Sequence, residues 1–432
     1  MIRPATHDAD VIVVGAGLAG LACAIHLTRA GREVIVVESS DGIGGRVRSD
    51  VVDGFILDRG FQVLLTAYPE AKAMLDYDAL DLRSFRAGAM VQRNGKRSLL
   101  GDPFRDPKSI VASVRAPVGS LVDKARVGLA RLTAARGSLA DLWKRPETST
   151  AERIRALGIS DAMTEQFFRP LFSGIQLDPS LATSSRMFDF VFRMLAEGDN
   201  AIPAQGIGAI SNQLASRLPA GAIRLRTQVV GVETGVVTLT DAAPLRAGAV
   251  VVATDGRQAS RLLTGRISEP GSNAVACLYF ACDQSPIDEA VLVLNGDGAS
   301  AGPVNNLCVP SLLSAAYAPP GRHLVSASVI AARPTGVERA TWARELDVAG
   351  RAQLRGWFGS QVDAWTTLPM SEIAHAQPAQ RSIEPAERPV DLGDGLFVCG
   401  DHRDQASING ALVSGRRAAA ALVGAAALAS AS

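Results

Sequence analysis

The stretch that most constrains the fold is residues 10–38 of the 432-residue chain. An apolar run at 11–14 leads into the glycine-rich string Gly15-Ala16-Gly17-Leu18-Ala19-Gly20. A segment with helical periodicity follows, and a second apolar run at 34–37 ends on Glu38. This order predicts a strand, a glycine turn, a helix and a second strand, which is the βαβ unit that binds a dinucleotide.

The positions in this unit have separate physical roles. Gly15 permits the tight turn, Gly17 lets the backbone approach a pyrophosphate, and Gly20 lets helix and strand pack closely. The helix N-terminus, at Leu18 and Ala19, supplies unpaired N–H groups and partial positive charge to the phosphates. Glu38 can accept hydrogen bonds from both ribose hydroxyls and would repel a 2′-phosphate, which disfavours NADP.

Composition is that of an ordinary globular protein, with 47% hydrophobic and 20% charged residues, and the length allows two or three domains. The net charge of +1 gives no indication of a nucleic-acid partner. The cysteines lie in apolar contexts without a CxxC pair, so we expect reduced core residues of a cytoplasmic protein, with no disulfide frame and no metal site. These are Cys23, Cys277, Cys282, Cys308 and Cys399. We expect no signal peptide, and a docked helix in the alanine-rich tail after Arg417.

A second glycine-rich segment follows Glu38. Adjacent glycines leave room for a planar ligand against the backbone, and arginine pairs with phosphate in bidentate fashion. The string ESSDGIGGRVRS at 38–49 resembles the E-x(4–6)-GGR segment of the flavin amine oxidase and phytoene desaturase superfamily, which also includes protoporphyrinogen oxidase. The resemblance implies that FAD is the cofactor, that Gly44, Gly45 and Arg46 lie along its ribityl chain and diphosphate, and that Ser39 also contacts it.

Other segments resemble the same superfamily. Residues 55–62 are similar to its F-x-x-D-x-G-x segment near the isoalloxazine ring. This implies cofactor contacts for Gly60 and Phe61, and a position facing the flavin or substrate for Gln62, with a plain polar turn residue as the equal alternative. Further along, the resemblance implies that the backbone of Val229 contacts the adenine. The strand at 249–253 should return to the sheet and place Ala253 and Thr254 beside the nucleotide.

The chain closes on a second strong motif. Residues 395–415 resemble the family's "L-F-x-x-G-D/E…G-A-x-x-S-G" close. The resemblance implies that Gly400 and Asp401 contact the ribityl chain or diphosphate. It also implies that a helix starting at Ser407, Ile408 and Ala411 faces the flavin pyrimidine, where its positive end would stabilise the anionic reduced flavin.

The middle of the chain is different in character. From about 71 to 199 helical periodicity dominates, and the phenylalanines between 167 and 192 resemble a family segment whose helices wall an apolar substrate tunnel. Plain core packing is the alternative. Residues 102–145 carry nine Lys/Arg against four Asp/Glu. A solvated helix face is our preferred interpretation of this basic segment, because aromatic anchors such as Phe104 and Trp143 are few, and a peripheral membrane contact is the alternative.

The predicted fold class is α/β, with a discontinuous Rossmann-like FAD-binding domain (1–70, 200–265 and 385–432). A substrate domain combines a helical part (71–199) and a mixed sheet (266–384). Because the chain has one G-x-G-x-x-G and no second, we expect no separate NAD(P)H domain and a substrate that is itself the reductant.

The prediction for the chemistry is less complete. Only Gln62 and His402 suggest themselves as catalytic groups, and a plain loop histidine is favoured for His402. Residues 400–415 contain no Phe, Tyr or Trp, which disfavours the aromatic cage of an amine oxidase. We therefore favour a desaturase, dehydrogenase or isomerase of the phytoene desaturase type, in which an isoprenoid-like or other lipid gives a hydride to flavin N5. An amine or amino-acid oxidase is the runner-up, and a non-catalytic flavin-binding protein is the third possibility.

Overall fold

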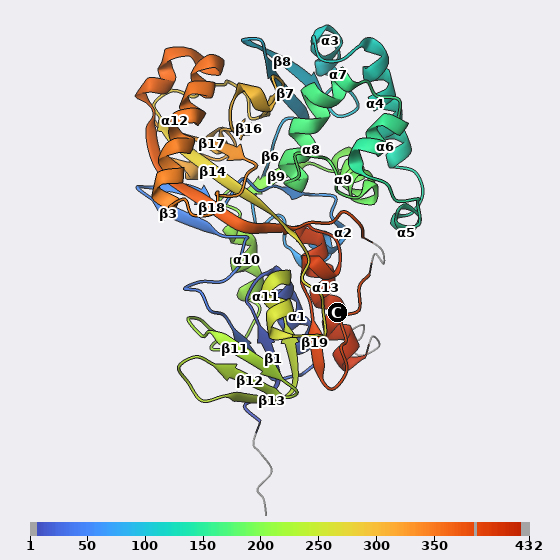
Figure 1. Ribbon diagram of the computed structural model, residues 1–432, viewed down its shortest axis with the longest axis vertical. Coiled ribbons are helices and arrows are strands. Elements are labelled where there is room, and N and C mark those ends of the chain that lie inside the picture. Colours follow the sequence, from blue (N-terminus) through green and yellow to red (C-terminus); the bar gives the residue numbers. More distant parts are fainter. Residues whose placement is uncertain (1–6, 384–386, 425–432) are drawn as a thin grey trace, which may run out of the picture.

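A computed structural model of the chain describes residues 7–383 and 387–424. Two large sheets lie at opposite ends of the long axis, and a group of helices flanks the second sheet (Figure 1). The predicted docked tail helix is present as far as Val423, and its remaining residues, 425–432, lie outside the described ranges.

The first sheet is the Rossmann-like sheet that the sequence predicts. Its parallel part has the order β10-β2-β1-β13-β19, and β12 and β11 extend it as an antiparallel edge. The strands are β1 (Ala9–Val14), β2 (Val34–Val37), β10 (Ile223–Arg224), β11 (Val229–Glu233), β12 (Val236–Leu239), β13 (Leu245–Val252) and β19 (Leu396–Val398). Both faces of β1 are covered: Val11 and Val13 join one apolar core, and Ile12 and Val14 join another, as expected for a parallel strand between two layers.

Helices from both ends of the chain cover one face of this sheet. The helices α1 (Leu18–Arg29) and α13 (Ile408–Val423) pack side by side, and α10 (Gly208–Ala215) lies next to α1. A Cβ at Gly415 of α13 would overlap the carbonyl oxygen of Ala19 and lie 2.9 Å from the Cβ of Ala22. Glycine at this position therefore permits the close approach of the two helices. The helix α11 (Gly256–Leu262) packs in the core on the other face.

The second sheet is mixed, in the order β18-β14-β17-β16-β15-β7-β8. Its strands are β7 (Gly88–Arg93), β8 (Lys96–Gly101), β14 (Ser272–Cys282), β15 (Leu292–Asn295), β16 (Val304–Cys308), β17 (His323–Val329) and β18 (Thr366–Pro378). The amphipathic helix α12 (Arg339–Phe358) packs on it through Trp342, Leu346 and Leu354. A mixed sheet within 266–384 was expected from the alternating pattern of that segment.

Two strands of this sheet lie where the sequence analysis expects helices. The hairpin β7–β8 belongs to residues 71–199, so the helical expectation for that segment is wrong at 88–101. Asn94 and Gly95 form the turn, and both have positive φ angles of 48° and 69°. An Asn-Gly pair with positive φ at both positions is the preferred two-residue hairpin turn, and this local signal outweighs the helical character of its surroundings.

The segment 105–199, which follows the hairpin, is mainly helical. It forms α3 (Ile110–Arg115), α4 (Leu121–Ala134), α5 (Leu139–Trp143), α6 (Thr150–Ala156), α7 (Asp161–Met163), α8 (Arg169–Gln176) and α9 (Ser185–Glu197). Three of these helices, α4, α5 and α6, begin with a capping box in which a serine and the acid three residues later cap each other's backbone.

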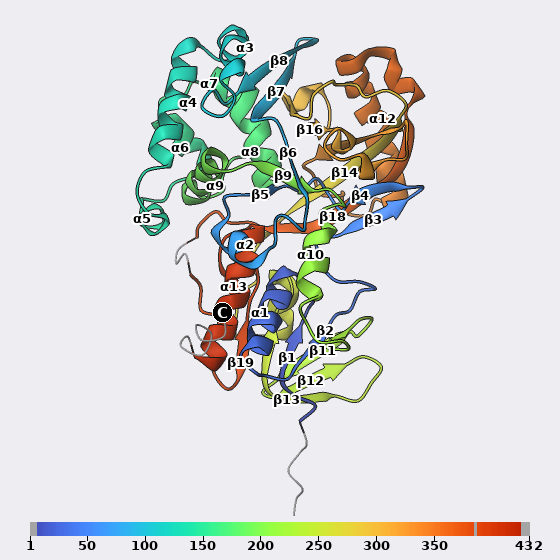
Figure 2. The ribbon, with the colours of Figure 1, turned by 180° about the vertical axis from the view of Figure 1, so that it is seen from behind.

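Short elements lie between the two large sheets. These are the hairpin β3 (Ser49–Val52) and β4 (Phe55–Asp58), the small sheet of β5 (Leu64–Leu65), β9 (Asn200–Pro203) and β6 (Leu82–Ser84), and α2 (Pro69–Met74) (Figure 2). None of the helices in the described ranges combines the length and apolar character that a membrane span requires. The short elements named above shape the space between the two large sheets.

Candidate functional site

A cavity of about 690 Å³ runs between the two sheets. It is lined by nearly all the residues that the sequence analysis assigns to the cofactor. These are Gly15, Gly17, Leu18, Ala19, Glu38, Ser39, Gly44, Gly45, Arg46, Gly60, Phe61, Gln62, Val229, Ala253, Thr254, Gly400, Asp401, Ser407, Ile408 and Ala411. The fold therefore brings together segments that are almost 400 residues apart in the sequence.

The glycine turn has the geometry that its sequence predicts. Gly15 has a φ of +109°, and a Cβ there would lie 2.9 Å from the carbonyl oxygen of Ala253. Gly20 does not line the cavity: a Cβ there would overlap the carbonyl oxygen of Gly15, which agrees with its predicted packing role. A Cβ at Gly17 would meet nothing within 4 Å, so the cavity is open above this residue. The N-terminus of α1 has no side-chain cap, which leaves its first N–H groups available to a ligand.

Glu38 lies at the end of β2, at the cavity wall. Its carboxylate accepts hydrogen bonds from the backbone N–H groups of Ala16 and Ser40, both at 2.9 Å. The side chain thus ties the glycine turn to the segment after β2. The carboxylate reaches the cavity from this position. Its contact with a ribose stays a prediction.

An ion pair joins the two ends of the chain at the cavity. Both Nη atoms of Arg46 donate to the carboxylate of Asp401 at 2.8 Å, and Nη1 also donates to the carbonyl oxygen of Ala376. Burial by itself would lower the pKa of Arg46, but the Asp401 carboxylate raises it overall. Arg46 is therefore charged at neutral pH, and the pair fixes the position of β19 relative to the double glycine before Arg46.

Gln62 lines the cavity, but its amide nitrogen has a structural role. Nε2 donates to the carbonyl oxygens of Arg46, at 2.7 Å, and Arg59, at 3.0 Å. The remaining polar atom of the side chain, Oε1, is an acceptor only. Gln62 can therefore accept a hydrogen bond from a ligand, and neither its chemistry nor its contacts fit a proton-transfer role.

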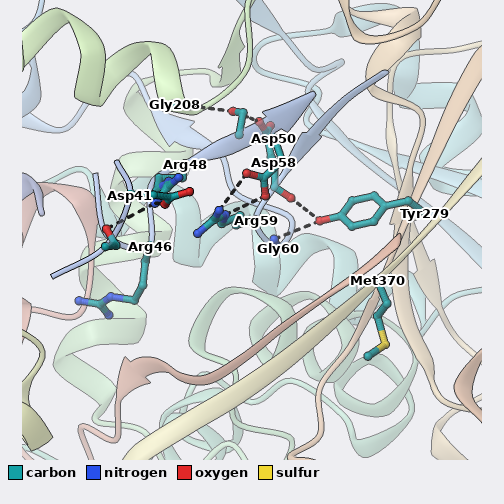
Figure 3. A network of polar contacts seen from close by, with 12 residues as sticks. Asp41, Arg46, Arg48, Asp50, Asp58, Arg59, Gly60, Gly208, Tyr279 and Met370 are labelled. Atoms are coloured by element: carbon teal, nitrogen blue, oxygen red, sulfur yellow. Dashed lines mark hydrogen bonds and ion pairs between the residues drawn. The ribbon is translucent and has the colours of Figure 1, made fainter. Parts of the chain in front are cut away.

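Behind the segment 59–62 lies a buried network (Figure 3). The hydroxyl of Tyr279 donates to the carbonyl oxygen of Asp58 and accepts from the N–H of Gly60 at 3.1 Å. The Asp58 carboxylate accepts from Tyr317 at 2.7 Å and Ser49 at 2.6 Å. Burial raises the pKa of Asp58, and these hydroxyl donors oppose the rise only in part. The network holds the backbone that presents Gly60, Phe61 and Gln62 to the cavity.

His402 does not line the cavity, which corrects its nomination as a catalytic group. Its ring is buried, and neither ring nitrogen has a partner among the described residues. Burial lowers its pKa to about 4. His375 on β18, which the sequence analysis did not select, does line the cavity and contacts Arg257 and Ser272 through its two ring nitrogens. Its position could not be deduced from sequence, because it depends on a bulged strand pairing far from any motif.

The phenylalanine-rich helices also differ in detail from the expectation. Phe168, Phe172 and Phe188 pack against one another in the core, with ring centroids 4.6 Å apart for the last two. The cavity is lined by aliphatic side chains of the same helices instead, namely Leu171, Ile175, Met187 and Leu195. The helices wall the cavity as the resemblance implies, but the aromatic rings form the core behind it.

Aromatic rings reach the cavity from elsewhere. Phe61 and Phe85 line it as an edge-to-face pair with centroids 6.0 Å apart, and Tyr68 lines it as well. The lack of aromatic residues in 400–415 thus does not make the cavity free of aromatic side chains. Two of these rings come from the site-facing loops before β5 and after β6, whose meeting point no local pattern reveals.

The sequence model of the family described as flavin containing amine oxidoreductase matches residues 18–423. The chain belongs to this family. Membership confirms the predicted superfamily of flavin-dependent oxidoreductases.

Individual members of the family match over shorter stretches. Putrescine oxidase from Kocuria rosea is 42% identical over 85 residues, which cover 19% of this chain and 18% of that protein. Phytoene dehydrogenase from Streptomyces griseus is 57% identical over 54 residues, or 12% of this chain and 11% of that protein. An oxidoreductase from Methanosarcina mazei shares the fold, with a TM-score of 0.72 and 19% identity over 94% of this chain and 99% of that one. The chain thus aligns with less than a fifth of either curated relative, and these two relatives act on different classes of substrate.

The cavity of this chain fits FAD on its own geometry. The open space above Gly17 and the uncapped N-terminus of α1 suit a diphosphate, and Glu38 lies where a ribose would be expected. Ser407 caps α13 by accepting from the N–H of Gly410 at 3.0 Å, and Ile408 and Ala411 of the same helix line the cavity. When bound, FAD supplies a two-electron acceptor, and the chain supplies position and charge.

Proposed function

We propose that this member of the family is a desaturase, dehydrogenase or isomerase that acts on an apolar, isoprenoid-like or other lipid substrate. The observation that carries the proposal is the composition of the cavity wall beyond the nucleotide-binding segments. The apolar part of that wall is formed by α8, α9 and the mixed sheet, through Leu171, Ile175, Met187, Leu195, Val275, Leu292 and Ile373, while Asn306, His375 and Gln377 are polar lining residues of the same sheet.

The distribution of charge in the cavity supports the same choice. Its acidic lining residues within the described ranges are Glu38, Asp255 and Asp401, and all three belong to the Rossmann-like part. A protonated amine would therefore find no carboxylate on the apolar wall. Burying an unpaired ammonium group costs far more than burying a hydrocarbon, which the aliphatic wall favours.

The apolar wall and the polar segment 59–62 suggest how the chain contributes to the reaction. The aliphatic side chains exclude water and align an extended hydrocarbon, and Gln62 Oε1 offers one acceptor at the polar end. Hydride transfer to a flavin depends mainly on orientation and a dry site. Desaturation also releases a proton from the adjacent carbon, and this proton would pass to water at the polar end of the cavity.

One observation favours the runner-up, an amine or amino-acid oxidase. Phe61 and Phe85 place two aromatic rings at the cavity, and aromatic faces attract ammonium groups. The rings meet edge to face at 89° to each other, rather than as two parallel walls. We rank this function second because the aliphatic wall has more side chains than the aromatic pair and carries no carboxylate.

Anaerobic reduction of the flavin tests the proposal. The purified holoprotein is mixed with a panel of isoprenoid hydrocarbons and a panel of di- and monoamines, and loss of flavin absorbance is followed. We expect reduction by one or more hydrocarbons and a slower rate in Leu195→Gln, which leaves the FAD segments intact. Reduction by amines alone would establish the runner-up in place of this proposal.

A further inference from the structure

The helices α3 and α4 expose an unusual amount of apolar surface. Of the twelve large hydrophobic side chains that are exposed in the described ranges, eight lie between 104 and 132. We call these eight the α3–α4 surface: Phe104, Ile110, Val111, Val114, Leu121, Val122, Leu129 and Leu132. Both ribbon views place α3 and α4 on the outer side of the helical group, away from the Rossmann-like sheet (Figures 1 and 2).

The distribution of side chains on α4 is the reverse of that on an ordinary surface helix. Leu121, Val122, Leu129 and Leu132 fall within an arc of about 100° on one face, and this face points to solvent. The opposite face is buried, and it carries Asp123, Ala130 and Ala134, with Val127 partly buried against the core beside them. In a surface helix the larger apolar residues normally point to the core. The sequence therefore places its large apolar residues on α4 for contact with something outside the fold.

The shorter helix α3 shows the same inversion. Its buried residue is Ser113, whose hydroxyl accepts from the N–H of Gly101 at 2.9 Å. Ile110, Val111 and Val114 are exposed instead. Two consecutive helices thus present most of their large aliphatic side chains outward and mainly small or polar side chains inward, which a solvated helix face does not explain.

The charges around this surface are unequal. The acidic side chains of 102–136 are engaged within the fold: Asp102 with Arg131, Asp106 with Arg86, and Asp123 with Ser120 and Ser160. By contrast, Lys108, Arg115 and Arg136 are exposed and form no ion pair with any residue that the structure describes. The exposed, unpaired charge beside the apolar side chains is therefore positive.

We propose that the α3–α4 surface binds the surface of an anionic lipid bilayer. Exposed aliphatic side chains next to unpaired basic residues match a bilayer interface, where hydrocarbon lies below acidic headgroups. A second copy of this chain fits less well, because a two-fold contact would place the same basic residues against each other. Nucleic acid fits less well, since Phe104 is the one aromatic ring of the surface and Arg131 already covers it at 4.6 Å.

This proposal stands apart from the proposed function, since it concerns where the protein is held and not what it oxidises. The helix α4 packs on α9, and α9 contributes Met187 and Leu195 to the cavity. A bilayer under α4 would lie one helix layer from the apolar wall. Trp143 is not part of the contact, because it packs against Phe190 with ring centroids 5.4 Å apart.

Vesicle co-sedimentation of the holoprotein tests the proposal. The probes are phosphatidylcholine vesicles with and without phosphatidylglycerol, at low and high salt. We expect the wild type to sediment with the anionic vesicles only. The paired substitution Leu121→Glu with Leu129→Glu should lower the partition coefficient at least about tenfold. Each of Lys108→Glu and Arg115→Glu should lower it about fivefold or more.

The matched control is Val348→Glu, which changes an equally apolar side chain, 69% exposed, on the distant helix α12. It should bind vesicles like the wild type. Bound flavin absorbance and melting temperature confirm that each variant is folded, and the Lys108 and Arg115 variants keep the test valid should the leucine pair not fold. Three results would overturn the proposal: no binding of the wild type to anionic vesicles, unchanged binding of the leucine and basic variants, or a lipid-free dimer that Leu121→Glu with Leu129→Glu converts to a monomer.

Discussion

Two glycines of one turn should respond to alanine in opposite ways. Gly17 and Gly20 are three residues apart, yet a Cβ at Gly17 meets open cavity, whereas a Cβ at Gly20 overlaps the carbonyl oxygen of Gly15 and lies 3.2 Å from the Cβ of Ala253. We therefore expect Gly17→Ala to impair FAD binding without unfolding the protein, and Gly20→Ala to destabilise the fold itself.

The magnitudes follow from this geometry. Gly17 has a φ of −73° and a ψ of 175°, which alanine adopts without strain. Alanine is a poorer N-cap than glycine, but it also restricts the unfolded chain, so the net change in stability should stay within about 1 kcal/mol. An added methyl where a diphosphate approaches should cost about 1–3 kcal/mol of FAD binding, or roughly 5- to 150-fold in Kd.

Gly20→Ala forces the turn and α1 apart. Overpacking of this kind costs about 1–3 kcal/mol, which corresponds to a fall in melting temperature of roughly 2–12 °C for a domain of this size. The strand β13, which carries Val252 before Ala253, is then displaced as well, because it forms the other wall of the contact.

Two measurements separate the variants. Flavin fluorescence quenching gives the Kd of the stripped protein for FAD, and thermal unfolding of the same stripped protein gives its stability. Gly128→Ala is the control, because its Cβ would also meet nothing within 4 Å but lies on α4, away from the cavity. Wild-type FAD affinity in Gly17→Ala, or wild-type apoprotein stability in Gly20→Ala, would refute the assignment of these two roles.

Three further predictions concern the residues around the cavity. Asp401→Asn leaves Arg46 without its charged partner, and since that arginine is partly exposed (31% of its side chain) we expect a loss of about 1–3 kcal/mol in urea unfolding, with reduced FAD occupancy in the purified protein. Tyr279→Phe removes the acceptor of the Gly60 N–H and should cost about 1–3 kcal/mol, measured in the same way, whereas an unchanged stability would show that the network is not structural. The pKa of buried His402, about 4, lies below its unfolded value of 6.5, so the unfolded state binds more protons between these pH values and stability must fall as the pH is lowered through this window. The full loss in the free energy of unfolding is about 3 kcal/mol. In His402→Gln, the difference in the free energy of unfolding between pH 7 and pH 4 should be smaller by this amount.

The sequence was most informative where chemistry requires a particular residue in a particular order. The glycine turn, Glu38 and the closing Gly400-Asp401 motif each follow a strand, and the carboxyl ends of parallel strands meet at one edge of a sheet. Their common location at the cavity could therefore be predicted. The ion pair between Arg46 and Asp401 could not, since no local pattern states which of many arginines an acid will meet.

Packing direction was the least predictable property. The periodicity of 167–192 predicts helices, but it does not decide whether Phe172 or Leu171 faces the cavity. The same ambiguity applies to α4, where the apolar stripe on Leu121 and Leu129 would ordinarily be assigned to the core. Which face is buried depends on the neighbours that tertiary folding supplies, and these come from distant segments such as α9.

The packing of α13 against α1 has a consequence for how the protein is made. The turn at Gly15 leaves the ribosome early, but β19 and α13 are translated nearly 400 residues later. At about 5–20 residues per second, the nascent turn remains without that partner for roughly 20–80 s, during which chaperones and proteases have access to it. We therefore expect flavin capture to follow the synthesis of β19 and α13, and a polypeptide interrupted before Asp401 to be colourless.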